Sequence, residues 1–83
     1  MSMNVQVRMY AGLRHLVGDG KFSLSLPEHA TVSTLRDRIV LDYPVLEAFM
    51  PTLVCAVDEE VQPPEHPLAD GDMIDLIPPI AGG

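Results

Sequence analysis

Alternating hydrophobic and polar positions divide the start of the chain into two predicted strands. Between residues 4 and 10 every second side chain is hydrophobic, as expected for a strand with one buried face. The segment Ala11–Val17 breaks this alternation and leads into Gly18-Asp19-Gly20, a typical turn composition, after which residues 21–26 alternate again. The two stretches therefore predict the legs of a wide hairpin.

The next segment has the spacing of a helix. Val32, Leu35 and Ile39 stand at positions i, i+3 and i+7, which lie on one helical face, and Thr31 precedes them at the preferred N-cap position. The residue after Asp42 precedes a proline and is therefore disfavoured in the helical region. The pattern predicts a helix from Val32 to Asp42.

Two later hydrophobic stretches predict further strands. Leu53–Val57 is a short apolar run, readable as a strand buried on both faces or placed centrally. Asp70-Gly71-Asp72 is a turn signal, and residues 73–77 follow as a strand with Ile74 and Leu76 on one face. The order strand, strand, helix, strand, short strand, strand predicts an α+β roll whose mixed sheet is covered on one face by one main helix.

The chain ends in Pro78-Pro79-Ile80-Ala81-Gly82-Gly83. Proline supplies no N–H, so this segment can leave the last strand unpaired, and at about 3.3 Å per residue it would reach roughly 20 Å. Glycine lacks Cβ and can pass through a narrow channel. We expect residues 1–77 to form the domain and 78–83 a flexible tail that carries the terminal carboxylate into another protein's active site. A frayed, inert end remains the alternative.

Composition restricts the classes of function. The chain has 83 residues, enough for one small domain, and its single Cys55 cannot form an internal disulfide, which fits a reducing cytoplasm. Five basic and twelve acidic residues give a net charge of −7, which would repel nucleic acid and favour encounter with a basic partner. No run of residues is long and apolar enough for a membrane span, and no targeting signal opens the chain.

Four segments, read together, resemble one known family. Pro-Pro-x-Ala-Gly-Gly at the end combines with a start of the form aromatic-Ala-x-x-Arg-x-Leu-Val-Gly. The combination resembles the ubiquitin-like β-grasp sulfur carriers, and among them the small subunits of molybdopterin synthase (the MoaD type). The segments that carry the resemblance are Tyr10–Gly18, Thr31–Arg36, His66–Asp72 and Pro78–Gly83.

The resemblance implies a β-grasp fold and chemistry at Gly83. A terminal carboxylate is ionised at neutral pH and needs activation before it can react as an acyl group. In the family, a ubiquitin-activating-like adenylyltransferase uses ATP to form an acyl adenylate, a sulfurtransferase provides sulfur, and the thiocarboxylate enters the synthase's large subunit. There it donates dithiolene sulfur to the pterin precursor of the molybdenum cofactor. The chain itself would be a non-catalytic co-substrate that binds no cofactor.

The same resemblance assigns roles along the tail. Gly83 would be the reactive residue, while Gly82 and Ala81 keep the approach narrow. Pro78 and Pro79 would aim the tail, and Ile80 lies between them and the narrow end. Residues 78–81 are accordingly expected to contact the partner proteins.

Strand parity predicts where those partners dock. If Val7, Leu76 and the residues alternating with them face the helix, then Tyr10 and Ile77 point the other way and Val61 joins them. Exposed apolar groups near the tail would form a partner-binding patch, although scattered surface hydrophobic residues are also normal. In the family, an apolar sheet face contacts both partners.

Other reactive residue types have simpler interpretations. Cys55 lies in an apolar run with no nearby basic residue, which indicates a small core residue rather than a nucleophile. The acidic residues around 58–60 and 70–72 lack the spacing of a calcium loop and are read as solvated turns. His15, His29 and His66 fall in three separate loops or turns without zinc-ligand spacing, so no metal site is expected.

Two alternatives remain beside the molybdopterin branch. A sulfur carrier for thiamine, cysteine or tRNA thiolation would use the same fold and the same chain end. A ubiquitin-like binding module with an inert tail would share the fold alone. Relatives often have Phe where this chain has Tyr10, and Asn near Asp58, and these departures concern partner contacts rather than the terminal chemistry.

Overall fold

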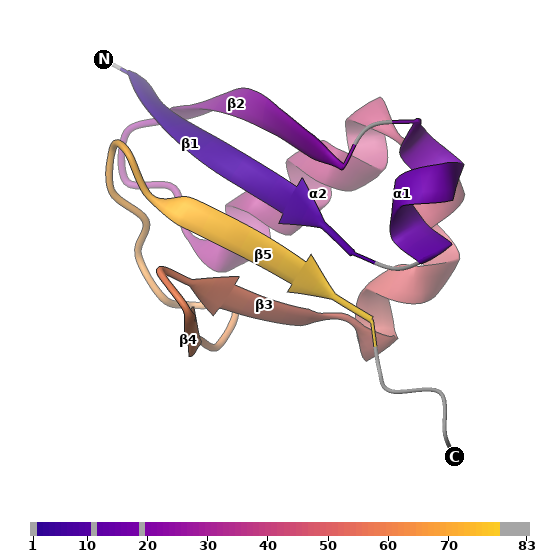
Figure 1. The fold of residues 1–83 in the computed structure, drawn as a ribbon. Coiled ribbons are helices and arrows are strands. Elements are labelled where there is room, and N and C mark those ends of the chain that lie inside the picture. The colour runs from indigo at the N-terminus through magenta and orange to yellow at the C-terminus, as the bar shows by residue number, and fades with distance from the viewer. Residues whose placement is uncertain (1, 11, 19, 79–83) are drawn as a thin grey trace.

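The computed structural model describes residues 2–10, 12–18 and 20–78. Within them, five strands form one mixed sheet in the order β2-β1-β5-β3-β4 (Figure 1). The central strands β1 and β5 are parallel, while β2 pairs with β1, and β3 with both β5 and β4, in antiparallel fashion. The strands are β1 Ser2–Met9, β2 Lys21–Pro27, β3 Val54–Val57, β4 Glu60–Val61 and β5 Met73–Ile77.

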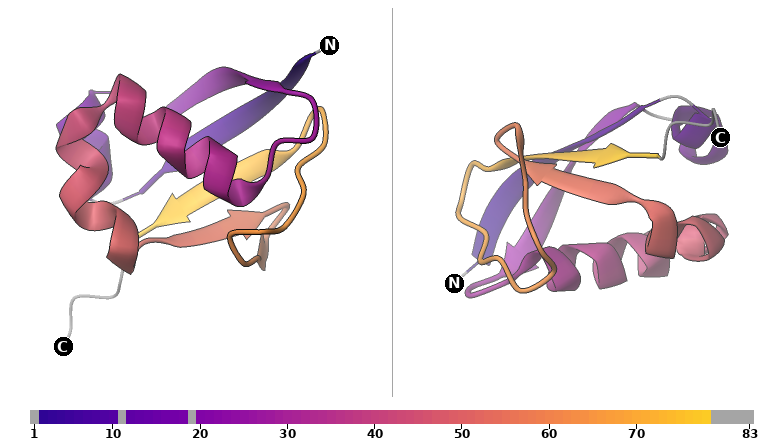
Figure 2. Two further views of the ribbon diagram at one scale, coloured as in Figure 1. Left: turned by 180° about the vertical axis from the view of Figure 1, so that it is seen from behind. Right: turned by 90° about the horizontal axis from the view of Figure 1, so that it is seen from below.

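The main helix, α2, spans Val32–Asp42, as the hydrophobic spacing predicted. It lies across one face of the sheet, as Figure 2 shows from behind. Its start is held by a reciprocal capping box: the Thr31 hydroxyl accepts a hydrogen bond from the Thr34 amide at 3.3 Å, and the Thr34 hydroxyl oxygen accepts one from the Thr31 amide at 3.0 Å. None of the helices in the described ranges is long and apolar enough to cross a membrane.

The wide hairpin contains a short helix that the alternation did not predict. α1 spans Gly12–Val17 and stands at the end of the sheet where β1 finishes (Figure 1). Leu13 is the one buried side chain of this helix. Because the helix has six residues, it is too short to show a hydrophobic period. His15 consequently lies in a helix, and its predicted place in a loop or turn was wrong.

A second unpredicted helix follows α2. The 3₁₀ helix η1 spans Pro44–Thr52, with its first proline at a position where the missing N–H costs nothing. It buries Leu46 and Met50, which close the end of the core next to α1.

The core lies between the sheet and α2, and its members confirm the predicted strand parity. Val7 and Leu76 are fully buried against the helix, and Cys55 is 3% exposed among them, as predicted for a small core residue. The β3 strand is also buried on its other face at Ala56. The largest fully buried side chains are those of Val5, Val7, Met9, Leu26, Val32, Leu35, Ile39, Leu46, Ile74 and Leu76.

The acidic residues 58–60 and 70 are exposed, as predicted, whereas Asp72 is half-buried, and several of their carboxylates also hold the backbone. Asp70 Oδ1 accepts a hydrogen bond from the Asn4 amide at 2.7 Å, and Asp58 Oδ1 accepts one from the Met73 amide at 3.0 Å. Asp58 and Glu59 both have positive φ angles, 49° and 74°, in the tight turn between β3 and β4. Asp70 therefore ties the start of β1 to the turn before β5, and Asp58 ties the start of β5 to the turn after β3.

Candidate functional site

The sheet face opposite α2, here called the outer face, carries a group of exposed apolar side chains. Tyr10 and Ile77 are 40% and 37% exposed, and Val61 is 68% exposed, so all three point away from the core as strand parity predicted. Val54 is the register partner of Ile77 and is also exposed. We call these four residues, Tyr10, Val54, Val61 and Ile77, the apolar patch.

Sequence reasoning missed Val54 as a patch member. The apolar run around it has no clear alternation, so its direction could not be read from the pattern. Only the antiparallel register that pairs Val54 with Ile77 places both side chains on the outer face.

A charged pair lies within the apolar patch. Arg8 and Asp75 are register partners on the parallel strands β1 and β5. The Arg8 guanidinium donates two hydrogen bonds to the Asp75 carboxylate, from Nε to Oδ1 at 2.7 Å and from Nη2 to Oδ2 at 3.1 Å. The Tyr10 hydroxyl donates a third hydrogen bond to Oδ1 at 3.3 Å. The hydrogen bonds to Asp75 raise the pKa of Arg8 above its ordinary value, against the opposing effect of partial burial.

The tail begins at the edge of this patch. Pro78 follows Ile77 directly and is half-buried. Pro79, Ile80, Ala81, Gly82 and Gly83, the other residues predicted to act or to contact partners, lie outside the described residues. Their predicted roles therefore stay predictions, while the start of the tail and the apolar patch are neighbours.

Cys55 offers no reactive thiol. Burial raises its pKa, and the charge of Arg36 lowers it by a smaller amount. The expectation that no basic residue lies near Cys55 was therefore wrong, but desolvation dominates and the thiol stays protonated at neutral pH.

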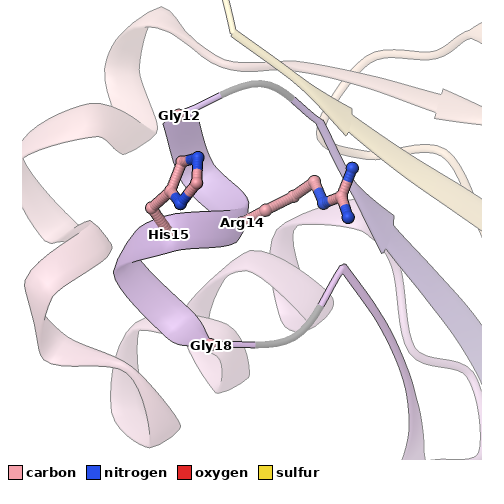
Figure 3. A pocket seen from close by; sticks show the side chains of 4 residues that line it. All are labelled: Gly12, Arg14, His15 and Gly18. Atoms are coloured by element: carbon pink, nitrogen blue, oxygen red, sulfur yellow. The ribbon is translucent and has the colours of Figure 1, made fainter.

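A hollow lies beside α1. It encloses about 450 Å³ and is lined by Gly12, Arg14, His15 and Gly18 (Figure 3). The side chains of Arg14 and His15 point in different directions, so no two groups converge on a ligand position (Figure 3). In residues 2–10, 12–18 and 20–78, no group of three or more His, Cys, Asp or Glu side chains could hold a metal ion.

Solved structures share the whole architecture. A putative molybdopterin converting factor subunit 1 from Pyrococcus furiosus superposes with a TM-score of 0.87 at 24% identity, covering 94% of this chain and 99% of that one. A complex of subunits 1 and 2 of the molybdopterin-converting factor from Helicobacter pylori contains a chain that is 26% identical, with a TM-score of 0.71 and coverage of 98% and 100%. The likeness confirms the predicted ubiquitin-like β-grasp roll.

Sequence comparison gives the family. The chain is 32% identical over 82 residues to the molybdopterin synthase sulfur carrier subunit of Arabidopsis thaliana, covering 99% of this chain and 85% of that protein. The model of the ThiS family matches residues 7–83, which include the predicted reactive end. With nearly its full length matched, the chain belongs to the ThiS family.

Proposed function

We propose that this chain is the sulfur carrier subunit of a molybdopterin synthase. The observation that carries the proposal is the similarity to a plant protein of that name, which is 32% identical in sequence over 99% of this chain. The outer face supports it, because the apolar patch lies where the Gly-Gly tail begins, so one docking event would also direct the tail.

The proposed chemistry takes place at the carboxylate of Gly83. An activating adenylyltransferase joins this carboxylate to the AMP moiety of ATP and releases pyrophosphate. The terminal sulfur of a persulfide on a sulfurtransferase then displaces AMP to form an acyl disulfide. A thiol cleaves its S–S bond, which forms a new disulfide with the sulfurtransferase and leaves the thiocarboxylate. Transfer of that sulfur to the pterin precursor, with water supplying the replacing oxygen, restores the carboxylate for another cycle. ATP is used by the activating partner, and the carrier binds no cofactor.

The proposed main partner is the large subunit, whose active site receives the tail. The Helicobacter pylori structure, a complex of two subunits of the molybdopterin-converting factor, supports a carrier that works as part of such an assembly. Tyr10, Val61 and Ile77 would contact the large subunit through the outer face, and residues 78–81 would line its entrance. A cytoplasmic location agrees with the single, free Cys55.

Mass spectrometry of the intact protein tests the proposal. The chain purified from cells that make the molybdenum cofactor should appear partly with the mass gain of one oxygen replaced by sulfur. Removal of Gly83 is the matched control and should abolish the gain. Complete absence of the thiocarboxylate, together with no adenylation by any activating enzyme, would leave an inert ubiquitin-like module as the better description.

The partner that co-purifies distinguishes the sulfur pathways. A synthase large subunit supports the proposal, whereas a thiazole synthase, a cysteine synthase-like enzyme or a tRNA thiolation enzyme would assign the same thiocarboxylate to another product. The likeness to a molybdopterin synthase subunit favours the first outcome.

A further inference from the structure

The pair of Arg8 and Asp75 is unusual in its position. Asp75 is 6% exposed and is the one buried charged or polar residue that the structure describes. Yet it points away from the core, and its row of register partners on the outer face continues through Ala56 to Val61. A charged pair in the middle of an apolar face is costly to cover unless the partner satisfies it.

The two members of the pair present themselves differently to a partner. Both carboxylate oxygens of Asp75 already accept hydrogen bonds, from Arg8 and Tyr10, and are hidden. The Arg8 side chain is 36% exposed. In the described ranges its remaining nitrogen, Nη1, donates no hydrogen bond to any other group. The pair therefore offers a cationic donor outward and conceals its anion.

A second cation lies beside it. Lys21 on β2 is the register partner of Arg8, so both side chains belong to the same row of the outer face, and Lys21 is exposed. The whole chain carries a net charge of −7 with five basic residues, so two adjacent cations form a local exception. Asp75 and Glu59 offset part of the charge of Arg8, so its outward donor and the exposed Lys21 together favour an anionic group on the partner.

We propose that Arg8, held in place by Asp75 and Tyr10, is the polar anchor of the outer face and receives a carboxylate of the large subunit when the apolar patch is covered. The occupant is thus an apolar protein surface with one acidic side chain set opposite Arg8 and Lys21. This inference rests on the proposed function, because it takes the large subunit as the partner.

Replacing both members of the pair by apolar residues distinguishes a role of Arg8 in binding from a purely structural role of the pair. The double variant Arg8→Met, Asp75→Leu removes the ion pair without leaving one charge unpaired, and such replacements are often neutral or stabilising for the fold. If the pair were only structural, the more apolar face would bind as tightly as before or tighter. If Arg8 meets a carboxylate, that acid is left buried without a partner in the complex.

The test is calorimetric titration of the large subunit with the full-length chain. We expect the double variant to raise Kd by about ten- to a hundredfold, the effect of losing a charge-assisted hydrogen bond in a buried contact. The Kd of the unsubstituted chain should also rise with added salt more steeply than that of the variant, since a charge contact is screened.

The Arg38–Asp42 pair on α2 provides a matched control. Its Nε and Oδ2 atoms are 3.0 Å apart, and Arg38→Met, Asp42→Leu makes the same chemical change on the other side of the molecule. The Kd of this control variant for the large subunit should stay within about twofold of that of the unsubstituted chain. The fold should also be kept, because exposed ion pairs contribute little to stability. Should the first double variant fail to fold, Arg8→Lys replaces it: the charge is kept, the forked donor is lost, and binding should weaken several-fold.

Each outcome decides between the two proposals. Unchanged or tighter binding by the double variant overturns the anchor while leaving the sulfur-carrier function intact. A loss confined to adenylation by the activating enzyme would move the contact to that protein and also overturn the anchor as proposed. If the unsubstituted chain does not bind the large subunit at all, the proposed function fails and the anchor fails with it.

Discussion

Single residues of the outer face should separate binding from folding, and Ile77 is the clearest case. Its side chain is 37% exposed within the apolar patch, so Ile77→Asp adds a charge without opening the core. We expect a loss of unfolding free energy of at most about 1 kcal/mol in urea denaturation, but at least a tenfold rise in Kd for the large subunit. Leu41→Asp, at a residue 77% exposed on α2, should change neither. Equal damage to folding and binding at Ile77 would contradict the assigned face.

Cys55 gives a second prediction for one residue. Burial raises the pKa of its thiol, so both access and thiolate content are low in the folded protein. Alkylation by iodoacetamide at pH 8 should be at least roughly a hundredfold slower in buffer than in denaturing urea, because reaction requires opening of the core. Mass spectrometry of timed samples measures both rates. A native rate close to the unfolded one would assign Cys55 to an accessible site.

The individual residues also reveal where sequence reasoning stops. Tyr10 and Ile77 could be assigned to the outer face because alternation fixes the side of every residue in a strand once one side is known. The contact of Arg8 with Asp75 could not be predicted, since these residues are 67 positions apart and meet only through the parallel register of β1 and β5. Long-range register leaves no local signal in the chain.

Among the elements, α2 was predicted to its ends because several local signals agree. Its apolar spacing, its capping residue and the proline beyond it all indicate the same boundaries. By contrast, α1 has six residues with one buried side chain, and η1 is a 3₁₀ helix with an internal proline. Their positions are set by packing at the end of the core rather than by a period in the sequence.

The capping box of α2 can be tested by itself. Thr31→Ala removes the hydroxyl that accepts a hydrogen bond from the Thr34 amide, and typical N-cap losses predict a decrease in unfolding free energy of about 1 kcal/mol. Ser33→Ala, at an exposed position in the first turn of the same helix, is the control and should change the free energy of unfolding by less than about 0.5 kcal/mol. Urea denaturation measures both. No difference between the two variants would mean that solvent replaces the cap without cost.

The unpredicted helix η1 should contribute to stability through Leu46. This side chain is fully buried, so Leu46→Ala removes methyl groups from a packed site and should cost about 2 to 5 kcal/mol. The neighbouring Val45 is 49% exposed, and Val45→Ala should cost less than about 0.5 kcal/mol. Thermal and urea unfolding provide the measurement. A small effect at Leu46 would show that η1 only covers the core loosely.

For the molecule as a whole, the place of β5 in the sheet determines where the predicted tail starts. β5, the strand that leads into the predicted tail, lies at the centre of the sheet between β1 and β3. A tail attached to a central strand starts from the most firmly held part of the fold. We therefore expect the body to set the direction of the tail without being changed by reactions at its end.

The predicted division into a body of residues 1–77 and a tail of 78–83 leads to the last prediction. Removing Gly83 alone, or residues 79–83 together, should shift Tm by less than about 2 °C, because the predicted tail does not stabilise the body. For comparison, a loss of 1 kcal/mol of unfolding free energy would lower the Tm of a domain this small by roughly 4 to 8 °C. Both deletions should nevertheless abolish thiocarboxylate formation, since the new terminal carboxylate, on Gly82 or Pro78, would fall short of the catalytic centre of the activating enzyme. Gly83→Ala separates reach from chemistry: it keeps the chain length and the carboxylate but adds a Cβ, so a strong loss of adenylation with unchanged Tm would indicate a channel that admits only glycine. Calorimetry together with intact mass after incubation with ATP and the activating enzyme measures both properties. A drop of several degrees on deletion would mean that the end packs against its own body and is not presented to partners.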